Sequence, residues 1–361
     1  MENVVTLSDL STAFRGKKVF VTGHTGFKGA WLLALLHVLG AEVKGYALPP
    51  DQPESLYNLL PEPVPGESVF ADIRDRDKLA GELLSFSPDY IFHLAAQAIV
   101  RTSYEIPADT FDVNVMGTAF LLEAMRTLAG PCVAVIITTD KVYENKETHV
   151  LYAETDRLGG HDPYSASKAC AEIVVSSFRN SFFAPASADV HEKAVVTARA
   201  GNVIGGGDWS RDRIIPDIIR SLQKEEKVIV RNPAAIRPWQ HVLEPLTGYL
   251  ALAAALRTDP LNMEAAYNFG PVPGDHLRVD EVVSLAIAAW GKGEWIDGSA
   301  PGQVHEATLL QLDISRALAG LPWKPRLTAA EAIDWTVKWY QQPPEARAAF
   351  TFAQIKNYYA V

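Results

Sequence analysis

The sequence has 361 residues, of which 48% are apolar and 21% charged, proportions that are ordinary for a globular protein and argue against intrinsic disorder. The formal net charge of −10 argues against a broad basic surface for duplex nucleic acid or anionic lipid. Two cysteines, Cys132 and Cys170, are too few for a disulfide framework or a cysteine-rich zinc site and suit a reducing compartment.

No segment of the sequence signals secretion or insertion into a membrane. The start, Met1-Glu2-Asn3, lacks a basic region followed by an apolar core, so we predict no signal peptide. The most apolar early stretch, 30–39, contains His37 and is shorter than a bilayer span. We therefore expect a cytoplasmic globular protein with no structural metal and with neither a nucleic acid nor a membrane as partner.

Short apolar runs alternate with longer helical patterns over the first 200 residues. The predicted strands are 16–22, 43–46, 69–71, 90–94, 133–138 and 194–200. The predicted helices are 27–39, which Gly40 ends, then 74–85, a helix that includes 111–125, and 164–178. This alternation predicts an α/β fold, a doubly wound parallel sheet of the Rossmann type with crossover helices on both faces.

The pattern changes near Gly205, where glycine, tryptophan, arginine and proline become frequent and the strands become short. We assign residues 1–200 to a cofactor-binding Rossmann core and residues 201–361 mainly to a smaller, interleaved substrate-binding lobe. One strand near 266–270 is expected to return to the sheet of the core.

A glycine-rich turn joins the first predicted strand to the first predicted helix. Gly23 permits the tight turn, Gly26 lets a pyrophosphate approach the backbone, and Gly29 lets the helix pack close to the strand. A glycine triplet alone is weak evidence, but its position between a strand and a helix is the one that a dinucleotide site requires. The GxxGxxG spacing is typical of the short-chain dehydrogenase/reductase superfamily, which this region resembles.

The resemblance implies further contacts with a dinucleotide. The second strand ends without an acidic residue for the adenosine ribose, since Asp51 comes late, and without an arginine for a 2′-phosphate, so NAD is favoured over NADP. Asp72 matches the adenine position but serves equally well as a helix N-cap. Asn114 resembles a helix asparagine near the cofactor, and a helix-kinking role is equally consistent. The implied cofactor-binding residues are Gly23, Thr25, Gly26, Phe27, Lys28, Gly29, Asp72, Ile73, Leu94, Ala95, Ala96, Gln97, Asn114, Thr138, Tyr164 and Lys168.

Tyr164 and Lys168 are four residues apart, so a helix places them on one face, one turn apart. A phenol with a pKa of about 10 is a poor base near neutrality. A nearby ammonium, helped by a positive nicotinamide, is expected to lower the pKa of Tyr164 towards the working range. The pair therefore indicates proton transfer coupled to hydride transfer.

Thr138-Thr139-Asp140-Lys141 ends the fifth predicted strand, and ligands bind at the carboxyl ends of strands in open α/β sheets. Thr139 stands where the superfamily places a hydroxyl on the reacting oxygen. A reductase or an epimerase needs only Tyr, Lys and Ser or Thr for hydride chemistry. The adjacent acid and base, Asp140 and Lys141, indicate an added proton-transfer step such as elimination of water.

With these residues, the chain resembles the NAD-dependent sugar-nucleotide 4,6-dehydratases of the extended short-chain dehydrogenases. The resemblance extends over nearly the whole chain and includes the segments 199–209 and 237–242. Lysine at position 141, where the dTDP-glucose branch has glutamate, is the pattern of the CDP-glucose branch. The implied substrate is therefore CDP-glucose, and the implied setting is deoxysugar biosynthesis such as that of lipopolysaccharide O-antigen.

The resemblance also implies a mechanism. Tyr164 takes the 4-hydroxyl proton while C4 gives hydride to NAD⁺, and the new ketone makes the C5 proton acidic. Asp140 then protonates the departing 6-hydroxyl, and Lys141, if neutral, removes the C5 proton. Alternatively Lys141 holds Asp140 or stabilises an enolate while another base acts. Hydride return to C6 and reprotonation of C5 leave a 4-keto-6-deoxy sugar and regenerate NAD⁺.

A nucleotide sugar carries a pyrophosphate, so the second lobe needs cationic and amide donors. Arg237 matches the pyrophosphate-binding arginine of the family and Asn202 its substrate-lining asparagine, while Arg213 and Asn268 are weaker candidates. Relatives commonly dimerise through the helices at 111–125 and 164–178, so a homodimer or a dimer of dimers is implied. Ordinary core packing explains the apolar residues of these helices equally well.

Other functions stay open at this point. A nucleotide-sugar 4-epimerase uses the same core without the acid–base pair. A 4,6-dehydratase that acts on another nucleotide sugar uses both the core and the acid–base pair. A non-catalytic NAD(H)-sensing regulator is more distant, because such proteins often lack one residue of the Tyr–Lys pair and both are present here.

Overall fold

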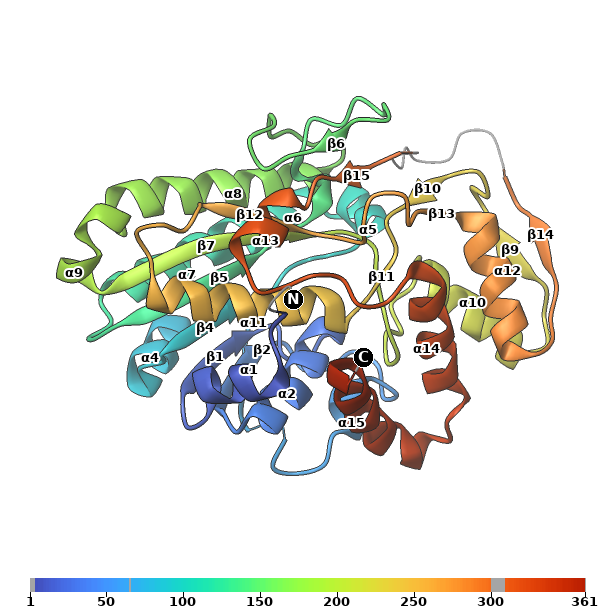
Figure 1. Cartoon of the computed structure of the whole chain (residues 1–361), viewed down its shortest axis with the longest axis horizontal. Helices are drawn as coiled ribbons and strands as arrows, with labels where there is room; N and C mark the ends of the chain where they lie inside the picture. The colour runs from blue at the N-terminus through green and yellow to red at the C-terminus, as the bar shows by residue number, and fades with distance from the viewer. Residues whose placement is uncertain (1–3, 65, 300–308, 361) are drawn as a thin grey trace.

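The computed structural model describes residues 4–64, 66–299 and 309–360. Seven parallel strands form the central sheet (Figure 1), in the order β12-β7-β5-β4-β1-β2-β3. Their bounds, in chain order, are β1 Lys18–Thr22, β2 Glu42–Ala47, β3 Glu67–Phe70, β4 Tyr90–His93, β5 Cys132–Ile137, β7 Lys193–Ala200 and β12 Ala266–Phe269. The predicted doubly wound Rossmann sheet is confirmed.

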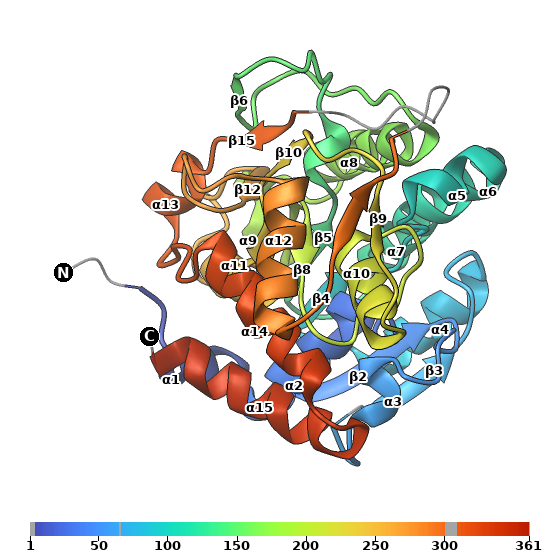
Figure 2. The same cartoon turned by 90° about the vertical axis from the view of Figure 1, so that its right-hand side faces the viewer.

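Helices cover both faces of this sheet. The strands alternate their side chains between the two faces, so Val19 and Val21 belong to one apolar core while Phe20 belongs to the other. The helices of the core region are α1 Leu7–Phe14, α2 Phe27–Leu39, α3 Leu56–Leu59, α4 Arg76–Phe86, α5 Val100–Glu105, α6 Pro107–Phe111, α7 Gly117–Arg126, α8 Pro163–Ser181, α9 Ala188–His191 and α11 Leu243–Thr258. Figure 2 shows α1, α2 and α11 on one side of the sheet and α4 and α7 on the other.

The predicted helix at 27–39 is confirmed as α2, with Gly40 in the left-handed conformation at its end. The helix predicted to include 111–125 instead consists of α6, a π-helical turn over Asp112–Met116, and α7. An added residue widens the helix at that turn, which turns the side chain of Asn114 inward, where it is 1% exposed.

The remaining elements gather at one end of the molecule, at the right of Figure 1. They are β8 Val203–Ile204, α10 Ile214–Gln223, β9 Val228–Val230, β10 Ile236–Arg237, β11 Gln240–His241, β13 Leu277–Arg278, α12 Val279–Trp290, β14 Trp295–Asp297 and α14 Ala329–Gln341. The short strands β6 Leu151–Tyr152 and β15 Gln311–Leu312 pair above the sheet, followed by α13 Ser315–Gly320, and α15 Pro344–Ala360 ends the described chain. The division into a core of 1–200 and a lobe of 201–361 stays a prediction, although β12 does pair with β7.

The last helices support the loop that follows β8. The Trp339 ring lies against Gly206 so closely that a Cβ at that glycine would overlap it. The Tyr340 hydroxyl donates to the backbone oxygen of Asp208, and the Trp31 indole of α2 donates to that of Gly206 at 2.8 Å. The loop at 205–209 is therefore held between the first Rossmann helix and the C-terminal part of the chain.

In the described part of the chain, none of the helices combines the length and the apolar character that a membrane span requires.

Glu244, in the first turn of α11, is a buried junction between this helix and the C-terminal segments. Its carboxyl group is 1% exposed and accepts hydrogen bonds from the backbone N–H of Leu327 at 2.8 Å and of Arg326 at 3.0 Å, and from the Tyr358 hydroxyl at 2.7 Å. Burial raises the pKa of Glu244 to about 7 because it disfavours the carboxylate form, although these hydrogen bonds oppose the shift.

We predict that Glu244 makes the fold less stable as the pH rises from 4.5 towards 7. A carboxyl group that binds its proton more tightly when folded contributes stability below its unfolded pKa, here 4.5, and loses that contribution as the pH rises through its folded pKa. Glu244→Gln keeps the size of the side chain and stays neutral at every pH. From pH 5 to pH 8, the free energy of unfolding of this variant should therefore rise by up to about 3 kcal/mol relative to that of the wild type. Urea unfolding at pH 5 and at pH 8 measures this difference, and Glu294→Gln, at an exposed position, serves as the control. The same change in the free energy of unfolding with pH in Glu244→Gln and in the wild type would contradict the prediction.

Candidate active site

The glycine turn sits between β1 and α2, and its three glycines meet different surroundings. Gly23 has a φ of +73°, and a Cβ there would lie 2.6 Å from the backbone nitrogen of Ala95. A Cβ on Gly29 would lie 2.7 Å from Cα of His24 and closer still to the Gly23 oxygen. Gly26 has an ordinary φ of −75° and, as its nearest atom, the Gly23 oxygen at 3.4 Å. The fold itself therefore requires Gly23 and Gly29, whereas Gly26 leaves open space at the N-terminus of a 13-residue helix.

Space beside a helix N-terminus fits an anionic group, because the free N–H groups and the helix dipole both favour negative charge. The turn that follows β4 lies against this space, since Leu94 and Ala95 contact Gly23. Phe27 and Lys28 begin the helix, and Thr25 donates its hydroxyl to the Leu48 backbone oxygen at 2.8 Å. The residues present thus fit the pyrophosphate of a dinucleotide.

The end of β2, where the resemblance implies a contact with the adenosine ribose, has no acidic residue. The His24 side chain packs there instead. The His24 ring lies against Gly45 of β2, and its Nε2 atom is 3.1 Å from the Ser68 hydroxyl. Burial lowers the pKa of His24 to about 4, so the ring is neutral at neutral pH. Asp51 lies exposed on the loop beyond β2.

Asp72 follows β3 and is paired with Arg74, whose guanidinium Nη2 lies 2.7 Å from Asp72 Oδ2. The hydrogen bonds from Arg74 lower the pKa of this carboxyl group. The helix N-cap of α4 is Asp75, which accepts a hydrogen bond from the backbone N–H of Lys78, so Asp72 does not cap this helix. Ile73 is buried against Gly117 of α7.

Asn114 ties the turn after β4 to the helix that carries Tyr164. Its Oδ1 atom accepts from the Gln97 backbone N–H at 2.9 Å, and its Nδ2 atom donates to the Gln97 oxygen at 3.0 Å and to the Ser167 hydroxyl at 2.8 Å. All of its side-chain polar atoms are engaged within the protein. This favours the structural role for Asn114, held at the π-helical turn, over direct contact with a ligand.

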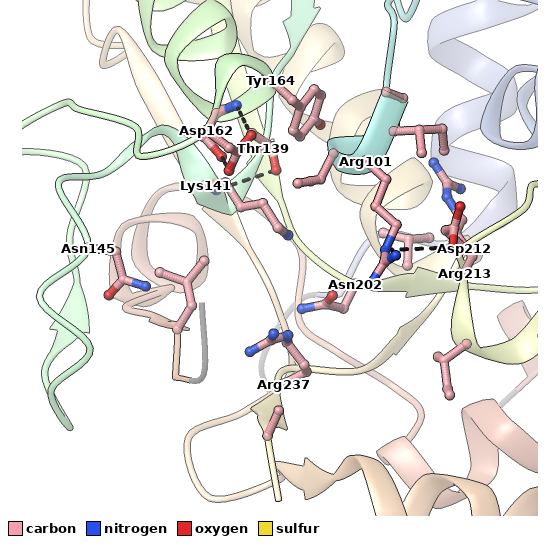
Figure 3. Close-up of a pocket in the computed structure, with 18 of the residues that line it drawn as sticks. Arg101, Thr139, Lys141, Asn145, Asp162, Tyr164, Asn202, Asp212, Arg213 and Arg237 are labelled. Carbon is pink, nitrogen blue, oxygen red and sulfur yellow. Dashed lines mark hydrogen bonds and ion pairs between the residues drawn. The ribbon is translucent and has the colours of Figure 1, made fainter. Parts of the chain in front are cut away.

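The five predicted catalytic residues come together at the carboxyl end of β5. Thr139 follows the strand, its hydroxyl donates to Asp140 Oδ1 at 2.9 Å, and the same hydroxyl lowers the pKa of the Tyr164 phenol. Lys141 Nζ lies 3.3 Å from the same Asp140 oxygen. Figure 3 shows Lys141 reaching from the Thr139 side towards the middle of the cavity, with Tyr164 above it. Tyr164 and Lys168 are both buried on α8, and Lys168 Nζ donates to the Ile137 backbone oxygen at 3.0 Å.

Asp140 is fully buried, and its Oδ2 atom has no hydrogen-bond partner among the described residues. A Cβ on Gly201 would overlap that oxygen, so this glycine of the segment 199–209 makes room for the carboxyl group. A buried carboxyl with one unengaged oxygen has the capacity to hold and release a proton.

In the protein alone, burial dominates the electrostatics of the Tyr164 phenol, and the lowering of its pKa by Lys168 with a positive nicotinamide stays a prediction. Burial raises the pKa of Tyr164 to about 12, although the Thr139 hydrogen bond and the Arg213 charge lower it in part. Burial also lowers the pKa of Lys168 to about 8, because it disfavours the ammonium. The lysine alone therefore does not bring the phenol into the working range, and the site needs additional positive charge near Tyr164 to form a phenolate.

Lys28 belongs to the same group of charges. Burial, together with the nearby charges of Arg213 and Lys168, lowers the pKa of Lys28 to about 7. The sequence placed Lys28 in the glycine turn only as a cofactor-binding candidate. Its position among these charges follows from the tertiary structure, because the Lys28 side chain interacts electrostatically with Arg213, Lys168, Asp140 and Lys141.

A buried ion pair that the sequence analysis missed lies beneath the catalytic residues. Glu172 and Arg199 are each 4% exposed in their side chains, with Arg199 Nη2 2.8 Å from Glu172 Oε2. Glu172 also accepts hydrogen bonds from the hydroxyls of Thr138 and Thr197. The position of Glu172, four residues after Lys168 on one helix face, was the available signal for it.

A cavity of about 1350 Å³ opens between this site and the C-terminal elements. Asn202, Arg213 and Arg237 line it, as do Thr139, Lys141 and Tyr164. Arg213 Nη1 lies 2.9 Å from Asp208 Oδ2, and Figure 3 shows Asn202 and Arg237 facing the cavity opposite Tyr164. The three polar candidates of the second lobe thus face the predicted catalytic residues.

Asn268 does not line this cavity. It is fully buried, accepts from the Tyr143 hydroxyl at 2.7 Å, and donates to the backbone oxygens of Tyr152 and Asp313. Because its amide is fully used in these contacts, it holds the β6–β15 segments to the end of β12.

Within the described residues, no group of three or more His, Cys, Asp and Glu side chains is arranged to hold a metal ion. The ring of His241 contacts the rings of Trp31 and Trp335 edge-on, in a packing role.

Comparison with known proteins gives three findings. Residues 20–336 match the family described as GDP-mannose 4,6 dehydratase. The CDP-glucose 4,6-dehydratase of Salmonella typhimurium is 47% identical over 330 residues, which are 91% of each chain, and a UDP-glucose 4-epimerase of Mycolicibacterium smegmatis is 33% identical over 90% of this chain and 98% of its own. The solved structure of MoeE5 in complex with UDP-glucose and NAD has a TM-score of 0.73 at 26% identity, covering 89% of this chain and 98% of MoeE5.

We predict that alanine at Gly29 destabilises the fold, whereas alanine at Gly26 weakens the binding of NAD⁺. Gly29→Ala should lower the free energy of unfolding by about 1–3 kcal/mol, because its Cβ meets backbone atoms that cannot yield. Gly26→Ala should change it by less than about 1 kcal/mol, yet weaken NAD⁺ binding at least about tenfold, because its Cβ fills the space beside the helix N-terminus. Urea unfolding and fluorescence titration with NAD⁺ measure the two quantities. Equal NAD⁺ affinity in Gly26→Ala and wild type would place the dinucleotide elsewhere.

Proposed function

The chain belongs to the GDP-mannose 4,6 dehydratase family, and within it we propose that the protein converts CDP-glucose to CDP-4-keto-6-deoxyglucose as an NAD-dependent hydro-lyase. The observation that carries the proposal is the buried Asp140, which lies beside Lys141 and accepts a hydrogen bond from Thr139 close to Tyr164. Hydride transfer alone does not need this second acid–base pair, whereas elimination of water does. The relative named CDP-glucose 4,6-dehydratase, 47% identical, supports the choice of substrate.

The residues of the glycine turn fit NAD. Gly26 leaves open space at the N-terminus of α2, where a pyrophosphate receives free N–H groups, and Gly23 and Ala95 form the floor of that space. Thr138 and the 94–97 turn border the same region. When bound, NAD⁺ supplies the hydride acceptor for C4, the hydride that returns to C6, and a positive charge near Tyr164.

Tyr164 is the proposed acceptor of the proton from the 4-hydroxyl. Its pKa of about 12 in the protein alone means that it is protonated at neutral pH. The surrounding cations, Lys168, Lys28 and Arg213, stabilise the phenolate form once further positive charge is added. Thr139, which lines the same cavity as the phenol, is placed to hold the same sugar oxygen.

Asp140 and Lys141 are the proposed pair for the loss of water. With a carbonyl at C4 the C5 proton becomes acidic, so a base breaks the C5–H bond while the C6–O bond breaks and a C5–C6 double bond forms. Asp140 gives its proton to the departing 6-hydroxyl, which leaves as water. Lys141 either removes the C5 proton or, as an ammonium, stabilises the enolate, and its contact with Asp140 at 3.3 Å fits both roles.

A homodimer, a cytoplasmic location and a part in lipopolysaccharide O-antigen synthesis stay predictions. The dimer is supported by apolar side chains exposed within the segments named for it, Met116 at 42% and Ile173 at 59%. Light scattering of the purified chain measures its mass in solution, and a monomer at micromolar concentration would contradict the dimer.

The test of the function is a substrate panel. We expect that incubation with NAD⁺ and CDP-glucose gives a product lighter by one water by mass spectrometry, with the absorbance of a 4-keto-6-deoxy sugar in alkali. The same assay with dTDP-, UDP- and GDP-sugars measures the specificity of the enzyme for the nucleotide base. A product of unchanged mass and inverted C4 would instead make the protein a 4-epimerase, and binding without any reduced nicotinamide in a single turnover would make it a sensor.

We further predict that Lys141→Met lowers turnover about 10²- to 10⁴-fold, because it removes the proposed base. Solvent deuterium incorporation at C5 of the product isolates this step. The exposed Lys227→Met, outside the cavity, serves as the control and should incorporate deuterium like the wild type. If Lys141→Met exchanges the C5 proton at the wild-type rate, Lys141 is not the base.

A further inference from the structure

A carboxylate bridges two arginines that reach the cavity from different parts of the fold. Asp212 Oδ1 lies 2.8 Å from Arg231 Nη1 and 3.6 Å from Arg101 Nε, and all three residues line the cavity. Figure 3 shows the contact between Arg101 and Asp212 at the side of the cavity away from Lys141. Arg101 lies on α5, just after the turn that follows β4, whereas Arg231 directly follows β9. The bridge therefore joins the wall beside the cofactor region to the substrate lobe.

The backbone at Asp212 is shaped to hold this bridge. The residue has a φ of +61°, a left-handed conformation that aspartate and asparagine tolerate better than other side chains. The next residue, Arg213, pairs with Asp208 instead, at 2.9 Å. The two neighbouring side chains of this loop thus serve separate ion pairs. Asp212 faces Arg101 and Arg231, and Arg231 also lies 3.7 Å from Asp217 Oδ2, a longer contact than its 2.8 Å to Asp212.

The ion pairs of this bridge are partly exposed to solvent, so a ligand can replace the carboxylate. The side chains of Arg101, Asp212 and Arg231 are 29%, 35% and 36% exposed. Ion pairs with this exposure contribute only about 0.2–1 kcal/mol each. Two guanidinium groups that share one carboxylate oxygen are close enough to share a phosphate oxygen in its place. A diphosphate offers more negative charge and bidentate geometry, so it competes well for both arginines.

We propose that Arg101 and Arg231 bind the diphosphate of the nucleotide, and that Asp212 occupies both arginines until the nucleotide arrives. The inference rests on the proposed function for the class of ligand, a nucleoside diphosphate sugar, and assigns to it residues that the sequence did not single out. Binding exchanges two arginine–carboxylate contacts for two arginine–phosphate contacts and frees the loop that carries Asp212. Arg237 faces the same cavity from β10 and adds a third guanidinium group.

Calorimetric titration of the full chain with CDP tests the exchange. Asp212→Asn suits the left-handed backbone and removes only the charge, so CDP should bind about 3- to 10-fold more tightly than to the wild type. Arg231→Gln should bind CDP about 10- to 100-fold more weakly, because a charge-assisted contact is lost. Glu294→Gln breaks an ion pair of similar length, 2.9 Å to Lys227, in the same lobe but outside the cavity, and should leave CDP affinity unchanged. Circular dichroism verifies that each variant is folded.

The sign of the Asp212→Asn effect decides the proposal. Weaker CDP binding would mean that Asp212 positions the arginines, and unchanged binding would mean that it does not compete, so either result overturns the proposal. If CDP itself does not bind, dTDP, UDP and GDP replace it, since the bridge faces the diphosphate and not the base, and binding of none overturns the proposal. A chain that shows the expected pattern but does not dehydrate CDP-glucose contradicts the proposed function alone.

Discussion

The geometry of the candidate site depends on the buried ion pair between Glu172 and Arg199. Glu172 lies one helical turn after Lys168 on α8, and Arg199 lies on β7, so the pair fixes the helix with the catalytic candidates to the sheet. Its remaining hydrogen bonds go to Thr138, at the end of β5, and to Thr197. Two buried charges are tolerated here because every carboxylate oxygen is paired. Tyr164, Lys168 and Thr139 thus share one rigid support.

Topology accounts for the rest of the arrangement. The strand order changes direction beside β1, so α2, the turn after β4 and the end of β5 meet at one edge of the sheet. The glycines of the turn and the proposed acid–base residues come from chain positions more than 100 residues apart, yet they adjoin because parallel strands end together. At this edge, burial keeps His24 neutral, and Asn114 uses its amide in hydrogen bonds within the protein.

Local signals in the sequence were sufficient for the sheet, the glycine turn and the Tyr–Lys pair. The bounds 27–39 of α2 could be predicted because a glycine stands at either end of an uninterrupted apolar run. The direction of the Tyr164 pKa could not, since it depends on burial by segments distant in the chain. Asn268 was proposed as a substrate contact on its position after a strand, but its neighbours Tyr143 and Asp313 are revealed only by folding. The Asp212 bridge likewise joins three residues that no spacing rule connects.

The support that Trp31, Trp339 and Tyr340 give to the loop at 205–209 has a consequence for the order in which the fold forms. That loop contains Asp208 and is followed by Asp212 and Arg213, which line the cavity, while its supports lie more than 130 residues away in the sequence. Contacts between such distant residues carry a large loop-closure entropy, so they form after the local contacts of the Rossmann units. This wall of the cavity is therefore expected to be among the last parts of the described chain to order during refolding.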